Sequence, residues 1–159
     1  MEILVFPIIA IMLFVSAYIT KRRFGLLGLA LAAGSLLSVI WGFDAGLVAG
    51  FFSIPSGPLT SALISSLLVL LPAGLLLFHG STYKTIIGRV IGASLFTLLA
   101  MAFLIEPLSH AVVVQGFGSN VYAWLVANRN MVEGVGLIAA IIDLFLTKPA
   151  HLSDKRHKR

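Results

Sequence analysis

Long apolar runs separated by short polar connections set the pattern of this chain. The runs cover residues 3–20, 24–51, 59–78, 86–105 and 131–147. An α-helix needs about 20 mostly apolar residues to cross the hydrocarbon core of a bilayer. The pattern therefore predicts an all-α fold, a polytopic integral membrane helix bundle with four transmembrane helices and a fifth, C-terminal one.

Two of the runs depart from a simple crossing. A continuous helix over 24–51 would reach ~42 Å against a hydrocarbon core of ~30 Å. We expect it to tilt steeply or to break near WGFDAG at 41–46. Pro72 lies inside the third run, where it removes a backbone hydrogen bond. It is either a hinge or one of the prolines that membrane helices tolerate, and we favour the second interpretation.

The last run, MVEGVGLIAAIIDLFLTKPA at 131–150, carries two carboxylates. Its apolar core measures ~25 Å as a helix, which is barely enough to cross, so it either spans the membrane or lies on the surface. Before it, within 106–130, we expect a short interfacial or re-entrant helix on the outer side. Ser119 or Asn120 would cap that helix.

Positive charge alternates between the connections. Basic residues follow the first run, enter the fourth and form the tail, whereas 53–58 is uncharged and 106–130 holds one Arg. Lys and Arg collect in cytoplasmic loops, so the alternation favours five crossings of a bacterial inner membrane, with the N-terminus outside and the C-terminus cytoplasmic. The residues expected beside anionic headgroups are Lys21, Arg22, Arg23, Lys84, Arg89, Lys148, Lys155 and Arg156.

Composition narrows the class further. Hydrophobic residues make up 59% of the 159 positions and charged residues 11%, which is too apolar for a soluble domain. We expect one membrane-embedded domain over 1–147 and a basic cytoplasmic tail over 148–159. The net charge of +5 is not a nucleic-acid signal, because the basic residues flank apolar runs. The lack of Cys excludes disulfides, thiolate nucleophiles and Cys-ligated metals.

Small residues recur at every fourth position of the second run. Such spacing keeps them near one helix face and lets another backbone approach closely. The contact is either packing within the chain, which we favour, or the interface of a homo-oligomer. The residues expected to pack helices are Ala30, Gly34, Ser38, Gly42, Gly46 and Gly50, together with the pair Gly88 and Gly92.

Carboxylates inside membrane segments are costly and are therefore functional candidates. Asp44 lies toward the outer end of the second run, where it is either hydrated or functional. Glu133 begins the last run, where a helix N-terminus favours negative charge and Arg129 lies four residues earlier for an ion pair. Asp143 lies near a helix C-terminus that disfavours anions. It faces Lys148, a partner helix or the cytoplasmic interface.

Two local motifs resemble known sites weakly. GASL at 92–95 is similar to the nucleophile site of rhomboid proteases, with Ser94 as nucleophile and His79 or His110 as base. Five runs are too few for that fold, and the two His residues fall on opposite sides. VVVQGFGSN at 112–120 resembles a potassium-channel filter, but a Gly-rich turn explains it better. The four His residues lack metal-ligand spacing, so we expect no catalytic residue, metal or cofactor.

The order of motifs over residues 3–106 is more distinctive. The first run ends in KRRFG, a long Gly- and Leu-rich run follows, and a basic linker enters IIGRVIGASL. This order resembles the CvpA, or colicin V production protein, family of small bacterial membrane proteins. The chain departs from the family where Phe24 separates the basic pair from Gly25, and where LLGLAL lacks an acid.

The resemblance implies a non-enzymatic scaffold or accessory role in envelope processes or in colicin V-type toxin production and export. The family offers no agreed catalytic residues to carry over. Partners would be membrane lipids and either a second copy or another membrane protein, with no nucleic acid. A small channel or transporter component is the alternative, and an intramembrane protease is the third reading.

Overall fold

The computed structural model describes residues 5–41, 57–78, 82–109 and 119–146, and most of these residues are helical. Within these ranges the one β-type contact is an isolated antiparallel bridge between Arg22 and Thr82. The helices are α1 Val5–Thr20, α2 Phe24–Trp41, α4 Pro58–Phe78, α5 Ile86–Ser109, α6 Ser119–Ala127 and α7 Arg129–Phe145. The all-α prediction is confirmed for the described chain.

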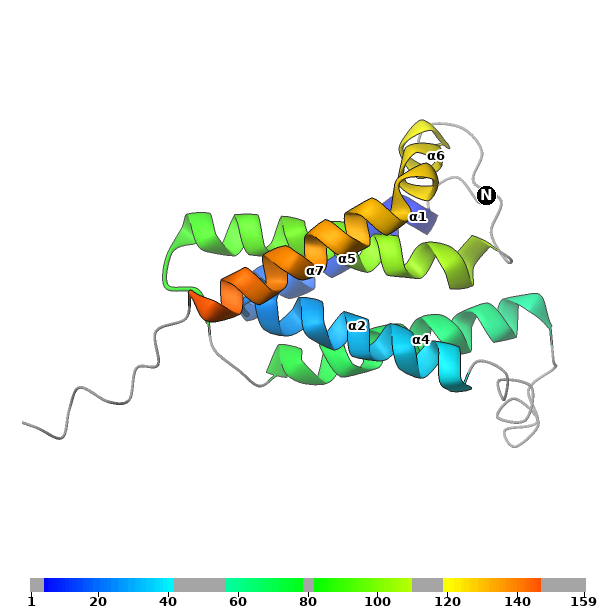
Figure 1. The fold of residues 1–159 in the computed structure, drawn as a ribbon, viewed down its shortest axis with the longest axis horizontal. Coiled ribbons are helices and arrows are strands. Elements are labelled where there is room, and N and C mark those ends of the chain that lie inside the picture. Colours follow the sequence, from blue (N-terminus) through cyan, green and yellow to red (C-terminus); the bar gives the residue numbers. More distant parts are fainter. Residues whose placement is uncertain (1–4, 42–56, 79–81, 110–118, 147–159) are drawn as a thin grey trace, which may run out of the picture.

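Five helices lie roughly along the long axis of the molecule and alternate in direction (Figure 1). In that view α5 and α7 lie above α2 and α4, and α1 lies behind. Helix α2 packs against α4, α5 and α7, while α1 packs against α5. Helix α6 turns away from α7 by 73°. The short helix expected before the last run is therefore present, and it leaves the direction of the bundle.

Helices α2, α4 and α5 are long and apolar enough to cross a membrane, and α6 with α7 makes a fourth if the bent pair is one span. Helix α1 has 16 residues, fewer than a full crossing needs. Among the described residues, the prediction of four full-length crossings plus a fifth is thus met only in part. The coarser prediction, a helical bundle of membrane type, agrees with the structure.

Helix α2 is described as far as Trp41, and the rest of the run 24–51, including the expected break near WGFDAG, lies outside the described residues. Pro72 lies within α4 and Pro107 within α5, and both helices continue past their proline. Predicted site residues that also lie outside the described ranges are Gly42, Asp44, Gly46, Gly50, Lys148, Lys155 and Arg156.

The core is apolar and centres on α2 and α5. Its most deeply buried large side chains come from α2, α4 and α5: Phe24, Leu27, Leu31, Val69, Phe96, Leu99 and Leu104. Small residues such as Ala100, Ala102 and Ala140 are also fully buried. No polar or charged residue is fully buried in the described part of the chain. Charged side chains instead lie near the two ends of the described bundle.

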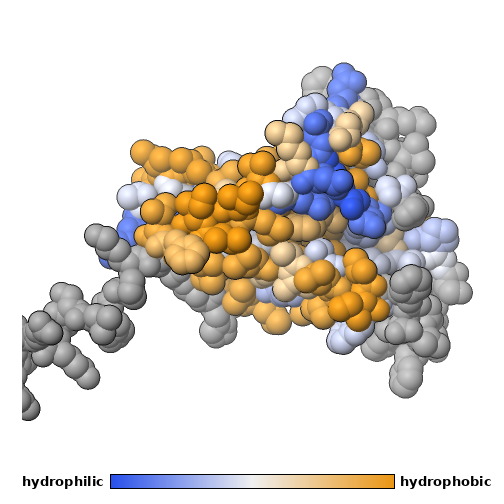
Figure 2. All heavy atoms as spheres, viewed as in Figure 1, coloured by the Kyte–Doolittle hydropathy of each residue, from blue (hydrophilic) through white to orange (hydrophobic). Residues whose placement is uncertain are grey.

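The outer surface is apolar over most of its length, as Figure 2 shows for one face. Large apolar side chains are exposed on every long helix, for example Met12, Leu36, Leu67, Ile87 and Ile138. Such a continuous apolar surface is far larger than a monomeric soluble protein carries, and it matches contact with lipid. Hydrophilic residues gather where α6 meets α7.

Helix α7 has an inverted arrangement of polar and apolar faces. Its exposed side chains are apolar: Met131, Val135, Ile138, Ile142 and Phe145. Its inward side carries two carboxylates and small residues at helical spacing: Glu133, Gly136, Ala140 and Asp143. A helix lying on a membrane surface would expose its charges to water instead. The side chains of α7 therefore suit a helix surrounded by lipid and packed on α2 and α5.

Candidate functional site

A polar cluster joins three chain segments at one end of the bundle. The Asp143 carboxylate, near the end of α7, accepts a hydrogen bond of 2.9 Å from the backbone N–H of Gly25 in the first turn of α2. It also accepts a hydrogen bond from the Tyr83 hydroxyl. That hydroxyl accepts the backbone N–H of Phe24 at 3.2 Å. We call Arg23, Phe24, Gly25, Tyr83 and Asp143 the Asp143 cluster, and its end of the molecule the basic end.

The Asp143 cluster provides an acceptor for the unpaired N–H groups at the start of α2. The first N–H groups of a helix have no partner within the helix and carry partial positive charge. Asp143 supplies both an acceptor and a negative charge there, so the carboxylate caps α2 although it belongs to α7. The Arg23 guanidinium lies 5.6 Å from the centre of the Tyr83 ring and adds positive charge beside it.

Tyr83 is held in its neutral form. Burial raises the pKa of its phenol, and the nearby Asp143 carboxylate acts in the same direction, since negative charge opposes loss of the phenolic proton. The N–H of Phe24 and the charge of Arg23 act in the opposite direction. Because the phenol stays protonated, it remains a donor to Asp143.

The Tyr83 ring lies against the first turns of α5. A Cβ at Gly92 would lie 2.5 Å from this ring, and one at Gly88 would lie 3.0 Å from it. The sequence predicted this glycine pair as a helix-packing surface. In the described chain both glycines lie against an aromatic ring from the connection between α4 and α5, and Gly88 also lies against Thr85, which sequence spacing alone does not reveal.

Basic residues of KRRFG also serve the ends of helices. The Arg22 side chain donates to the backbone carbonyls of Leu77 at 2.9 Å and Phe78 at 2.7 Å, the last two residues of α4. Helix C-termini carry unpaired carbonyls and partial negative charge, which a guanidinium complements. Lys21 has a φ of 58°, and its carbonyl accepts the N–H of Tyr83 at 2.8 Å. The motif thus fastens the α1–α2 turn to the α4–α5 connection.

Small residues of α2 contact two different helices. A Cβ at Gly34 would collide with the backbone carbonyl of Val69 in α4. A Cβ at Gly25 would lie 2.5 Å from the carbonyl oxygen of Ala140 in α7, and one at Gly28 would lie 2.8 Å from the Ala140 side chain. Ala30 is buried, and Ser38 faces a cavity. The contact with α7 was not predicted, since it uses positions outside the every-fourth pattern.

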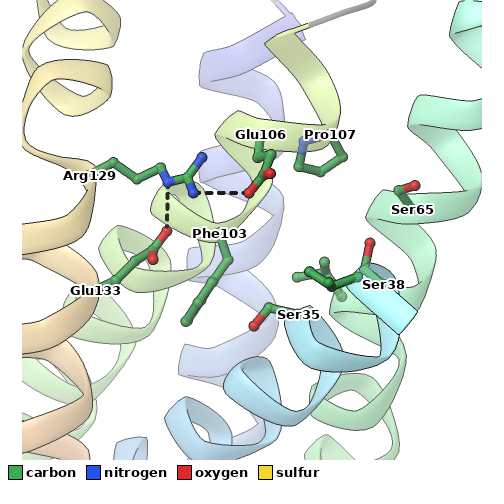
Figure 3. Close-up of a pocket in the computed structure, with 10 residues that line it drawn as sticks. Ser35, Ser38, Ser65, Phe103, Glu106, Pro107, Arg129 and Glu133 are labelled. Atoms are coloured by element: carbon green, nitrogen blue, oxygen red, sulfur yellow. Dashed lines mark ion pairs between the residues drawn. The ribbon is translucent and has the colours of Figure 1, made fainter. Parts of the chain in front are cut away.

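The opposite end of the bundle contains a cavity of about 660 Å³ between α2, α4, α5 and α7. We call this end the cavity end. Figure 3 shows three hydroxyl groups on one side and a charged group on the other. The polar residues that line the cavity are Ser35, Ser38, Ser65, Glu106, Arg129 and Glu133. Its apolar walls include Val69 and Phe103, which belong to or pack against the core.

The charged group is a pair of carboxylates bridged by one guanidinium. Arg129 contacts Glu106 of α5 at 2.9 Å and Glu133, one turn along α7, at 3.2 Å. The predicted Arg129–Glu133 ion pair is confirmed. Glu106 was missed because it lies 23 positions before Arg129 and its helix continues past Pro107. The Arg129–Glu106 pair holds the start of α7 to the end of α5, whereas the Arg129–Glu133 pair lies within α7.

The cavity offers more hydrogen-bond acceptors than donors, so it favours a ligand that carries donors. Each carboxylate contacts Arg129 through a single oxygen, Oε2 of Glu106 and Oε1 of Glu133. The Ser35 hydroxyl donates to the Ala32 carbonyl at 2.9 Å, so its oxygen remains available as an acceptor. Within the described ranges no group of three or more His, Cys, Asp or Glu side chains has metal-binding geometry.

The described residues do not assemble a protease site or a channel filter from the two local motifs. Ser94 is an exposed residue of α5. Its candidate partners His79 and His110 lie outside the described residues, as do 112–118 of the filter-like segment.

No protein-family model matches the chain, and neither a curated protein nor a solved structure matches it. Its class therefore follows from its own features. These are apolar helices of membrane-crossing length, an apolar outer surface and charged side chains near the two ends of the described bundle.

Proposed function

We propose that this chain is a non-enzymatic scaffold or accessory protein of the bacterial cytoplasmic membrane. The observation that carries the proposal is the use of Asp143, the intramembrane acid with no local explanation in the sequence. It caps α2 and binds Tyr83, so it serves the architecture of the bundle. The core beside it is filled by apolar side chains such as Leu27, Leu31 and Leu99.

The resemblance to the CvpA family supplies the finer part of the proposal, a role in envelope processes or in toxin production and export of the colicin V type. Its motifs acquire a physical purpose in this fold. Arg22 binds the end of α4, Gly25 admits Asp143, and the glycines at the start of α5 admit the Tyr83 ring.

The proposed orientation places the basic end in the cytoplasm and the cavity end outside. Lys21, Arg22, Arg23, Lys84 and Arg89 belong to the connections at the basic end or to the start of α5. Lys and Arg favour the cytoplasmic side, where Lys21 and Lys84, both exposed, would contact anionic headgroups. A homo-oligomer or a membrane-protein partner would use the apolar outer surface.

Cysteine labelling tests this orientation, because the chain has no Cys of its own. Single Cys residues at 57, 84 and 153 are treated in intact cells with a membrane-impermeant maleimide. We expect labelling of 57 in intact cells and of 84 and 153 after the membrane is opened. Labelling of 57 and 153 from the same side would rule out five crossings.

The alternative function, a small channel or transporter component, has the cavity in its favour. Ion flux into proteoliposomes separates the two functions. A scaffold leaves the flux at the level of empty liposomes, with a known pore-forming protein as positive control. Sustained flux that disappears in Leu31→Trp, which narrows the core below the cavity, would establish a channel and overturn the scaffold proposal.

A genetic test addresses the finer role. The chain is expressed in a colicin V-producing bacterium that lacks its own CvpA-family protein. We expect it to restore toxin production, and we expect Asp143→Ala to restore less. Normal expression of the chain in the membrane without any restored production would reject the colicin-type role and leave the membrane scaffold to be judged by flux.

A further inference from the structure

The cavity end contains a second feature that the scaffold role does not use. The cavity has a volume of about 660 Å³ and is lined by both ion pairs of Arg129. Its size is typical of sites that bind small organic molecules. Four helices contribute to it, so its shape depends on the folded bundle and not on one local segment (Figure 3).

The charge of the cavity favours a cation. Glu106 and Glu133 contribute two negative charges and Arg129 contributes one positive charge, so the group carries a formal charge of −1. In the described part of the chain, Oε1 of Glu106 and Oε2 of Glu133 make no ion pair or hydrogen bond. Both oxygens are strong acceptors that a donor-bearing cation satisfies.

The opposite wall adds acceptors of weaker strength. The Ser35 hydroxyl already donates a hydrogen bond to the Ala32 carbonyl, so it would contact a ligand as an acceptor, through its oxygen. Ser38 and Ser65 present hydroxyl groups that can either donate or accept a hydrogen bond. Phe103 and Val69 form an apolar boundary that methylene groups would contact. An aromatic face also favours a cation placed over it.

We propose that the cavity binds an aliphatic primary ammonium ion, with the –NH₃⁺ group at the carboxylates and the hydrocarbon part toward Phe103. This chemistry has two sources, a free amine in the outer solution or the aminoethyl headgroup of a phospholipid. A bare metal ion fits less well, because the two carboxylates already share Arg129 and no third carboxylate or imidazole joins them among the described residues.

Thermal unfolding of the full-length protein in nanodiscs made of phosphatidylglycerol tests the proposal. Butylamine is titrated at constant ionic strength, with tetramethylammonium and butyrate as comparison ligands. Butylamine is expected to raise the melting temperature saturably. Tetramethylammonium has the charge without N–H donors, and butyrate has the opposite charge, so neither should do so.

Two variants link the response to the cavity. Glu106→Gln removes one charge from a side chain that is 61% exposed, so the bundle should fold. It should weaken butylamine binding by about tenfold or more, as expected for loss of a charge-assisted hydrogen bond. Ser65→Ala should weaken binding roughly two- to tenfold. Its matched control, Ser61→Ala, changes an exposed serine one turn earlier on α4 and should leave binding unchanged.

A repeat in phosphatidylethanolamine nanodiscs identifies the source of the ammonium group. A butylamine response that vanishes there indicates that the lipid headgroup already fills the cavity, whereas an unchanged response indicates a free amine. The proposal is overturned if butyrate stabilises the protein, if tetramethylammonium matches butylamine, or if Glu106→Gln binds butylamine as tightly as the natural chain. A failure here leaves the scaffold function standing, because flux and complementation do not depend on this ligand.

Discussion

Glycine positions on the helices differ sharply in what surrounds them, and this difference decides which can be changed. Gly34 faces the backbone of Val69, which cannot move aside as a flexible side chain can. Gly74, on α4, has no atom within 4 Å of a Cβ placed there. The two positions share a residue type and a helical conformation, so they form a matched pair.

We expect Gly34→Ala to destabilise the bundle by about 2 kcal/mol, the range found for overpacked cores. Gly74→Ala should be neutral or stabilising by about 0.5 kcal/mol, since Ala favours helix more than Gly does. Helicity followed by circular dichroism during SDS titration in mixed micelles measures both. Equal effects at the two positions would contradict the close contact of α2 with α4.

The hydrogen bonds of Tyr83 and Asp143 belong to one network, so their effects should not add. Tyr83→Phe removes the donor to Asp143 and the acceptor of the Phe24 N–H. Asp143→Asn removes the negative charge at the start of α2. In a double-mutant cycle we expect a coupling of about 1 kcal/mol, measured by the same SDS titration. A coupling near zero would mean that the two side chains act independently.

Alkaline pH offers a second check of that network. The pKa of Tyr83 is raised in the folded protein, so the neutral phenol stabilises the fold at every pH below its unfolded value. This contribution is lost as the pH rises through the raised value in the folded state. Tyr83→Phe should therefore show a weaker loss of stability above pH ~10 than the natural chain does.

At the scale of elements, the sequence predicted the helices better than their partners. Apolar runs and caps locate α4, α5, α6 and α7 to within a few residues. The Arg129–Glu133 pair was predictable because four positions make one helical turn. Asp143 was not, since its acceptor role depends on Gly25, 118 positions earlier in the chain. Contacts set by helix crossing leave no regular spacing in a sequence.

The sequence of α7 leaves two possibilities, a helix that crosses the bilayer and a helix that lies on its surface, and these differ in the depth of its residues. If it crosses the bilayer, the middle of its lipid-facing side lies deepest. Spin labels at 131, 138 and 145, all strongly exposed on that side, report depth through collisions with oxygen and with a water-soluble nickel complex. We expect 138 to be deepest and 131 and 145 to be shallower. Three equal depths would instead place α7 parallel to the surface.

At the scale of the whole molecule, different interactions hold the helices together at the two ends of the described bundle. At the basic end backbone hydrogen bonds and a cap join α2, α7 and the α4–α5 connection. At the cavity end the Arg129–Glu106 ion pair joins α5 to α7, while α2 and α4 form the other wall of the cavity. The two ends should therefore respond differently when one fastening is removed.

Arg129→Gln leaves Glu106 and Glu133 facing each other without a bridging charge, and like charges repel. We expect the distance between spin labels at 40 and 131, both at the cavity end, to lengthen and broaden. A pair at 29 and 142, toward the basic end, serves as the control and should not change. A change at both ends would show that the Asp143 cluster is not an independent fastening.

The inverted faces of α7 have a consequence for biosynthesis. A segment that carries two acids on one side enters lipid poorly on its own, because each charge must find a partner before it leaves water. The Gly25 N–H that binds Asp143 and the Arg129 guanidinium that binds Glu133 both come from earlier positions in the chain. We therefore expect α7 to enter the membrane only after α2 is in place to bind Asp143.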